Sequence, residues 1–212
     1  MKFNLEDTPY GRFACLLFDL ILLNILFVIC SIPIVTIGAS LTSLYYTFYQ
    51  RTKGENSMIK TFFTAFRCNF LQSTLLWIVA LTIGGLLVCN FVIASSFSTY
   101  QTLAIRFLMI PTFLYCAILS YAFPLLSTFE HTLKQLLLNS IFMSIAHFPR
   151  TILLVLTNLL PMIILLLAPS WIAGMFYIWL PCMFSTCAYI STNLLTSIFA
   201  SYSTEESEDL ID

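Results

Sequence analysis

Charged side chains are scarce in this sequence: Asp, Glu, Lys and Arg make up only 9% of its 212 residues, whereas 59% are hydrophobic. A soluble domain carries about 25% charged residues, so a chain of this composition cannot cover a surface in water. Several apolar runs approach the roughly 20 residues that are needed to cross about 30 Å of hydrocarbon. The composition therefore predicts an integral membrane protein and leaves no soluble stretch long enough to fold alone.

Sequence motifs of the common enzyme classes are also missing. The chain contains no GxSxG, no HExxH and no glycine-rich phosphate loop. Asp19 is the one carboxylate inside the apolar runs, too few for paired acid–base chemistry. The seven cysteines form no CxxC, and neither they nor His131 and His147 have the spacing of metal ligands. We expect no enzymatic activity, no metal and no cofactor, and the net charge of −1 argues against a nucleic-acid partner.

The apolar runs predict an all-α polytopic bundle of about six membrane helices. The expected spans are 13–32, 35–50, 74–97, 103–126, 148–168 and 171–199. The second span has only 16 residues, about 24 Å of helix at 1.5 Å per residue, so it either crosses as a short span or re-enters. Residues 1–200 would form one transmembrane domain. The remainder, 201–212, carries five acidic side chains and no base, which is typical of a flexible tail.

The segment after the first apolar run decides the topology. Pro33 removes a helix donor and restricts the residue before it, and Gly38 follows five residues later. If 33–38 is a turn, eight of the nine basic residues lie on the side of the N-terminus and Arg106 lies opposite. One continuous helix would leave only six of nine together. The positive-inside rule therefore predicts that both termini are cytoplasmic.

The short second span has a polar face without charge. Ser40, Ser43, Thr47 and Gln50 lie opposite an apolar stripe. A helix on the membrane surface would place Lys or Arg there, so we expect this helix to pack among other helices, with its hydroxyls bonding across to them.

Two further segments are amphipathic and read as cytoplasmic helices on the membrane surface. In the first, the apolar face comprises Ile59, Phe62, Phe63, Phe66 and Phe70, opposite Lys60, Thr64 and Arg67. In the second, 127–147, the apolar stripe comprises Leu133, Leu137, Ile141 and Ile145, and Glu130 pairs with Lys134. Lys60, Arg67 and Lys134 would together form a docking face for a cytoplasmic partner.

Four polar residues fall inside the spans: Asp19, Asn24, Asn90 and Asn158. Such residues are costly in a membrane and often mark a transport path. The alternative is that they form contacts between helices, worth about 0.6–2 kcal/mol each for the asparagines, with Asp19 bonded to Arg12 or to a neighbouring helix. Arg106 reads as an anchor at the outer interface.

The stretches CSIPIVTIGASLTSLYY and TFFTAFRCNFLQSTLLW resemble motifs of the YesL-like family of bacterial membrane proteins. The matching residues are Cys30, Ser31, Pro33, Val35, Thr36, Gly38, Ala39, Phe63, Phe66, Arg67, Asn69 and Phe70. The resemblance implies a polytopic plasma-membrane protein of a Gram-positive bacterium, with unknown activity, whose relatives often accompany carbohydrate-uptake and glycan-degradation genes. Pro33, Thr36 and Gly38 would be structural residues of the motif, and no catalytic residue carries over.

Three functions remain open on the sequence. The first is an accessory or regulatory subunit linked to carbohydrate uptake, whose partner would be a carbohydrate ABC importer or its ATPase. The second is a small solute transporter or channel that uses Asp19 and the asparagines. The third is a structural membrane module without transport activity. The sequence leaves a homo-oligomer open in each case.

Overall fold

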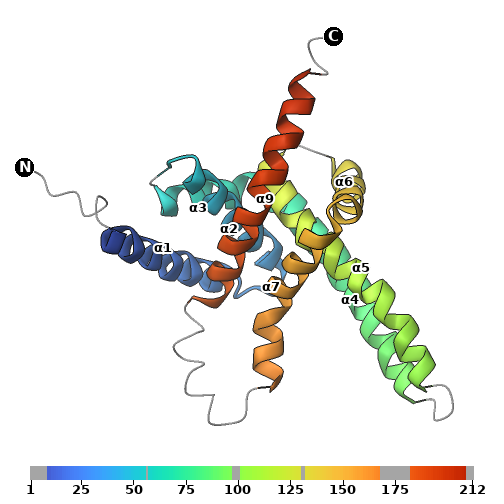
Figure 1. Cartoon of the computed structure of the whole chain (residues 1–212). Helices are drawn as coiled ribbons and strands as arrows, with labels where there is room; N and C mark the ends of the chain where they lie inside the picture. The colour runs from blue at the N-terminus through green and yellow to red at the C-terminus, as the bar shows by residue number, and fades with distance from the viewer. Residues whose placement is uncertain (1–8, 56, 97–100, 130–131, 168–181, 209–212) are drawn as a thin grey trace, which may run out of the picture.

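The computed structural model describes residues 9–55, 57–96, 101–129, 132–167 and 182–208, and these residues contain helices and no strand (Figure 1). The predicted all-α class is therefore confirmed. The elements are α1 (Pro9–Cys30), the 3-10 turn η2 (Ile34–Thr36), α2 (Ile37–Thr52), α3 (Met58–Cys68), α4 (Phe70–Ser95), α5 (Gln101–Thr128), α6 (Leu133–Ala146), α7 (Phe148–Leu167) and α9 (Met183–Glu208).

Three of the described helices are long and apolar enough to cross a membrane: Phe13–Cys30, Phe70–Ser95 and Thr102–Thr128. A fourth span results if Leu133–Ala146 and Phe148–Leu160, bent by 109°, are counted as one. The chain is thus a helical membrane protein, as predicted. Of the other expected spans, α2 has only 16 residues and many hydroxyl side chains, and 148–168 and 171–199 extend into residues outside the described part.

The end of the chain also differs from the prediction. The expected last span, 171–199, begins among residues 168–181, which lie outside the described part. Helix α9 then continues to Glu208, past the point where a flexible acidic tail was expected to begin. Residues 209–212 of that tail also lie outside the described residues.

Helix α2 lies at the centre of the molecule, in contact with α1, α3, α4, α5 and α9 (Figure 1). Leu44 and Phe48 are completely or almost completely buried and belong to a core that also contains Tyr121 of α5 and Leu195 of α9. The short second span is therefore an interior helix.

The buried Ser and Thr hydroxyls of α2 do not bond across to other helices, contrary to the prediction. Ser40, Thr42, Ser43 and Thr47 are fully buried, and each donates to the carbonyl oxygen four residues earlier, at 2.6–3.1 Å. A Ser or Thr hydroxyl that is hydrogen-bonded within its own helix needs no partner on a neighbouring helix. That helix can then approach as closely as it could to an Ala side chain.

The chain reverses at the predicted turn. Thr36 Oγ1 donates to the carbonyl oxygens of Cys30 (2.6 Å) and Pro33 (2.7 Å), which closes the turn. A Cβ at Gly38 would lie 2.5 Å from the carbonyl oxygen of Ser73 and 2.6 Å from Cβ of Trp77, so only glycine permits this contact between α2 and α4. Pro33, Thr36 and Gly38 thus have the structural roles expected of motif residues.

The two amphipathic helices form, with one change of face. In α3, Phe62 is buried against the core while Lys60 and Arg67 are exposed, as predicted, although Ile59 and Phe63 also remain exposed. In α6 the buried residues are Leu136, Ser140, Met143 and Ser144, whereas Ile145 is 65% exposed. The buried face of α6, which packs against α5, is therefore rotated from the predicted stripe, of which Leu133, Leu137 and Ile141 are only half-buried. Glu130, the expected partner of Lys134, lies outside the described residues.

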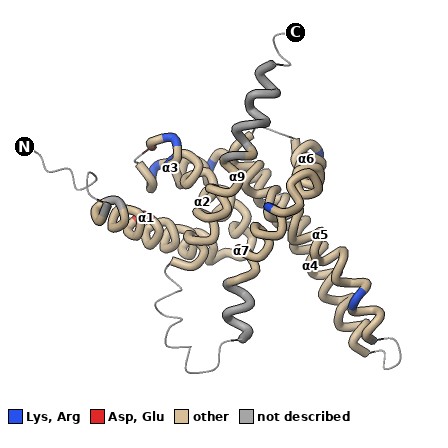
Figure 2. The backbone as a smooth tube through the Cα atoms, viewed as in Figure 1, with Lys and Arg blue, Asp and Glu red and all other residues tan. Residues whose placement is uncertain are grey.

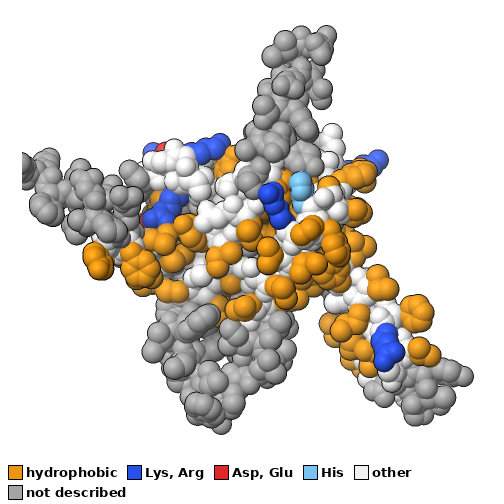
Figure 3. All heavy atoms as spheres, viewed as in Figure 1, with side chains coloured by type: hydrophobic (Ala, Val, Ile, Leu, Met, Phe, Trp, Pro, Cys, Tyr) orange, Lys and Arg blue, Asp and Glu red, His pale blue; other side chains and the backbone are white. Residues whose placement is uncertain are grey.

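Charge and apolar surface are separated along the molecule. The Lys and Arg residues of α2, α3 and the α6–α7 junction lie toward one side, and that of α5 lies near the far end of the α4–α5 pair (Figure 2). Hydrophobic side chains cover the region between them (Figure 3). This is the distribution of a membrane protein with one basic face.

Candidate functional site

Asp19 of α1 forms an ion pair with Arg51 at the end of α2, with Oδ2 and Nη2 2.8 Å apart. The side chains are 18% and 22% exposed, so the pair is largely shielded. Of the two partners that the sequence suggested, a neighbouring helix is therefore one that Asp19 does contact, and the side chain of Arg12 lies outside the described residues. The contact joins the N-terminal half of α1 to the last turn of α2, which is what a hairpin of the two helices requires.

Asn24, five residues further along α1, is buried and accepts a hydrogen bond from the backbone N–H of Ser185 at 3.3 Å. Ser185 lies in the first turn of α9, where backbone N–H groups have no partner within the helix. Asn24 therefore acts as a cap for α9 that is supplied by another helix.

Asn158 of α7 lies in a buried polar cluster. Its Nδ2 donates to Ser120 Oγ of α5 at 3.0 Å, and its Oδ1 accepts from Ser191 Oγ of α9 at 3.4 Å. The side chain of Tyr45, from α2, interacts with both Asn158 and Ser191. Four helices meet at this cluster, which can therefore fix their relative positions.

Asn90 differs from the other three polar residues. It is exposed on α4, and its Nδ2 donates within the same helix to the carbonyl oxygen of Leu86 at 2.8 Å. The structure therefore does not bring the four candidates into one site: Asp19, Asn24 and Asn158 each bridge different helices, and Asn90 lies on the surface of α4.

A groove of about 840 Å³, which we call the interfacial groove, lies beside Lys53 at the end of α2. Its walls come from the end of α2, the second half of α3, the start of α4 and the end of α5. Its polar lining residues are Tyr46, Tyr49, Gln50, Lys53, Thr64, Asn69, Gln72, Ser127, Thr128 and Thr132. The Lys53 ammonium lies 4.4 Å from the centroid of the Tyr49 ring, a cation–π contact that holds it at the wall.

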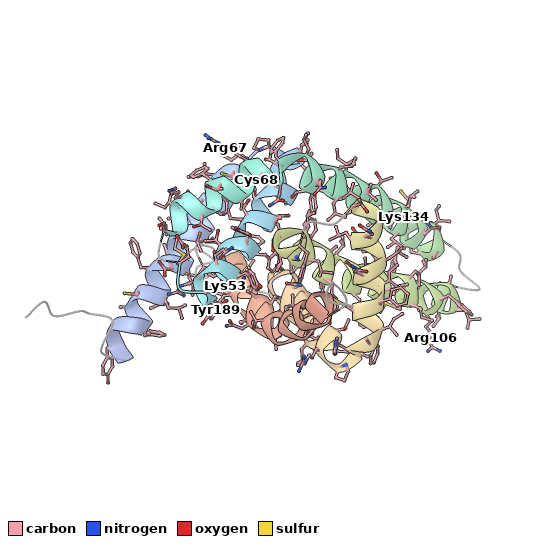
Figure 4. The ribbon with its side chains drawn as sticks, turned by 90° about the horizontal axis from the view of Figure 1, so that it is seen from above. Lys53, Arg67, Cys68, Arg106, Lys134 and Tyr189 are labelled. Atoms are coloured by element: carbon pink, nitrogen blue, oxygen red, sulfur yellow. The ribbon has the colours of Figure 1, made fainter. Side chains whose placement is uncertain are left out.

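The predicted docking residues do not line this groove but lie on the helices beside it, and Arg67 and Lys134 are labelled in Figure 4. On α3, Lys60 precedes the lining residue Thr64 by one turn, and Arg67 adjoins the lining residue Cys68. Lys134 begins α6 two residues after Thr132, whose side chain forms a capping box with Gln135. All three cations are exposed.

The sequence did not reveal the groove itself, because its residues come from four helices and become neighbours only through the fold. The one local signal was the concentration of tyrosine at the end of α2, where Tyr45, Tyr46 and Tyr49 fall within five residues.

The fold and the groove define a helical membrane protein with a basic polar face and, among the described residues, no cluster of His, Cys, Asp and Glu able to hold a metal ion. A family model described as a protein of unknown function, DUF624, matches residues 20–91. This segment contains the turn motif, α2, α3 and most of α4. No curated protein and no solved structure matches the chain.

Proposed function

We propose that this chain is a non-enzymatic accessory subunit of the plasma membrane that binds a cytoplasmic partner through Lys60, Arg67 and Lys134. The observation that supports this most strongly is the placement of the three exposed cations around one groove. Cations that are far apart in the sequence would thereby face the same partner. A basic surface attracts an acidic partner and speeds its association.

The YesL-like resemblance suggests which partner to look for. The family-model match covers the stretches that carry the resemblance, and relatives of this type often accompany carbohydrate-uptake genes. The proposed partner is accordingly a carbohydrate ABC importer or its ATPase. The basic face would lie in the cytoplasm together with both termini, as the positive-inside rule requires.

A purely structural module is the second candidate, and the polar contacts favour it over a transporter. Asp19, Asn24 and Asn158 each bridge two or more helices, which is how polar residues stabilise membrane bundles. A transport path would instead need such residues to line one continuous passage. Asp19→Asn and Asn90→Ala are the variants that test transport, and a loss of solute flux in either would restore that function.

Co-purification from native membranes in mild detergent tests the accessory role. The wild-type chain should bring down a second protein, and the triple variant Lys60→Glu, Arg67→Glu, Lys134→Glu should lose it. Arg106→Glu is the matched control, because it reverses an exposed cation on the opposite side. Recovery of the wild-type chain alone, or equal recovery of the partner with all variants, would reject the proposal.

A further inference from the structure

The interfacial groove has the composition of a site for a polar, negatively charged ligand. Lys53 is the only charged residue among its lining residues, and hydroxyl and amide side chains supply most of the other polar groups. Its volume of about 840 Å³ is within the range of about 300–1,000 Å³ that is typical of small-molecule sites. Asn69, at the start of α4, makes no side-chain cap for that helix.

The groove also has side chains of the kind that are found where lipid headgroups meet a protein. Tyr46 and Tyr49 belong to its wall, and tyrosine is enriched at the membrane–water boundary. The amphipathic helix α3 forms another wall, and its neighbouring residues Ile59 and Phe63 are exposed apolar side chains. A ligand in the groove would therefore be within reach of the bilayer.

An apolar track leads from the groove along α4. Leu71 lines the groove and is nevertheless 81% exposed. Leu75 and Ile78, which follow at i+4 and i+7 on the same helical face, are 50% and 46% exposed. The track thus connects the polar interfacial groove to the exposed apolar surface of α4. This combination matches a phospholipid, which has a polar headgroup and apolar acyl chains.

We propose that the interfacial groove binds one anionic glycerophospholipid. The phosphate pairs with Lys53, the headgroup hydroxyls bond to Gln50, Asn69 and Gln72, and an acyl chain lies along Leu71, Leu75 and Ile78. Basic hollows between membrane helices on the cytoplasmic side recognise anionic headgroups in this way. The site does not depend on the proposed partner, because Lys53 is not one of the three docking cations.

Native mass spectrometry of the purified full-length chain, titrated with phosphatidylglycerol or phosphatidylcholine, tests the site. The wild-type chain should retain one phosphatidylglycerol more tightly than phosphatidylcholine. Lys53→Gln should weaken phosphatidylglycerol binding about fivefold, the effect of one basic residue near an anionic lipid. Arg106→Gln, which removes an exposed cation far from the groove, should leave it unchanged.

Two further measurements separate the lipid from other anions. Leu71→Ser should weaken phosphatidylglycerol binding while leaving the thermal unfolding temperature in detergent unchanged, since this side chain is largely exposed. The water-soluble headgroup glycerophosphoglycerol should bind more weakly than the lipid, because it lacks the acyl chain.

The proposal is overturned if phosphatidylglycerol and phosphatidylcholine bind equally, if Lys53→Gln binds as the wild type does, or if the soluble headgroup binds as tightly as the lipid. It is also overturned if Lys53→Gln loses the co-purified protein partner and keeps the lipid, since the groove would then be part of the protein interface. That last result would leave the accessory role intact.

Discussion

The centre of the molecule and the projecting half of the α4–α5 pair are both apolar, but they use apolar residues in opposite ways. Nine of the 16 residues of α2 are buried against other helices. By contrast, only Ala94 is buried within the protein among residues 81–95 of α4 and 102–116 of α5, and this half of the two helices runs away from the remaining elements (Figure 1). We call the section comprising 81–95 and 102–116 the arm. Hydropathy alone cannot distinguish these regions. Lipid tails are as apolar as leucine, so an apolar side chain is suited both to a protein core and to contact with lipid.

What distinguishes them is side-chain size. The buried face of α2 is rich in Gly, Ala, Ser and Thr, which allow close approach of neighbouring helices. The arm presents large aliphatic and aromatic side chains, among them Leu86, Val92, Phe107 and Ile110, each at least 60% exposed. Small residues therefore identify close contact between helices in this chain, whereas large side chains occur both in the core, as Phe48 does, and on the exposed arm.

Truncation of a large side chain tests this difference most strongly. Phe48→Ala in α2 should lower the free energy of unfolding by about 3–5 kcal/mol, because it leaves a cavity in the core. Phe107→Ala in the arm should change it little, since Phe107 is 74% exposed and Phe48 only 1%. Denaturant titration in detergent micelles measures both. Equal losses would mean that the arm is packed against protein in the native state, as in a homo-oligomer.

Glycine substitutions give the next largest contrast. Gly38→Ala should cost about 1–3 kcal/mol, because the new Cβ meets backbone atoms of α4 that cannot move aside. Gly85→Ala is the matched control in the arm, where a Cβ meets nothing within 4 Å and alanine favours the helix. Thermal unfolding of the two variants should therefore shift in opposite directions. If Gly38→Ala is as stable as the wild type, the close contact of α2 with α4 is wrong.

The ion pair at the edge of the core should have an intermediate effect. Asp19→Asn removes one charge of a largely shielded pair, and the expected loss lies between about 1 kcal/mol for an exposed pair and about 3 kcal/mol for a buried one. The double variant Asp19→Arg, Arg51→Asp should recover part of that stability. Arg106→Gln in the arm is the control and should change it little. No recovery in the double variant would show that Asp19 acts through other contacts.

The smallest expected difference concerns the asparagines. Asn158→Leu should destabilise the bundle by about 0.6 kcal/mol and at most about 1.7 kcal/mol, the range measured for hydrogen bonds between membrane helices. Asn90→Leu should be neutral or slightly stabilising in lipid, because Asn90 contacts only its own helix in the described hydrogen bonds. Unfolding in lipid nanodiscs resolves the two. A larger loss for Asn90→Leu would instead indicate that this side chain meets a partner outside the chain.

Local features of the fold could be predicted from the sequence, and relations between distant segments could not. The turn at 33–38 follows from Pro33 and Gly38, and the exposed cations of α3 follow from its helical periodicity. The burial of α2 was foreseen from its uncharged polar face. The bonding of its hydroxyls was not, because a Ser or Thr can donate either to its own helix or to a neighbour with little difference in energy.

Two other features could not be predicted because they depend on how distant helices pack: the buried face of α6 and the interfacial groove. The face of α6 depends on where α5 lies against it, and that contact determines that Leu136, Ser140 and Met143 turn inward. The interfacial groove likewise requires the end of α5 to lie beside α3, a juxtaposition that no periodicity within either helix encodes. The candidate asparagines could be found from the sequence, but whether they share one site depends on the packing of α9.

The cap that Asn24 supplies to α9 joins residues 161 positions apart. At about 5–20 residues per second, the ribosome needs roughly 8–32 s to make the intervening chain. During that interval the first hairpin is in the bilayer before α9 has been synthesised. The small hydroxyl residues of α2 then lack the helix that later packs against them. Folding of this protein therefore includes a delay between the insertion of the first hairpin and the synthesis of α9. A membrane insertase that shields polar helices from lipid would protect α2 during that delay.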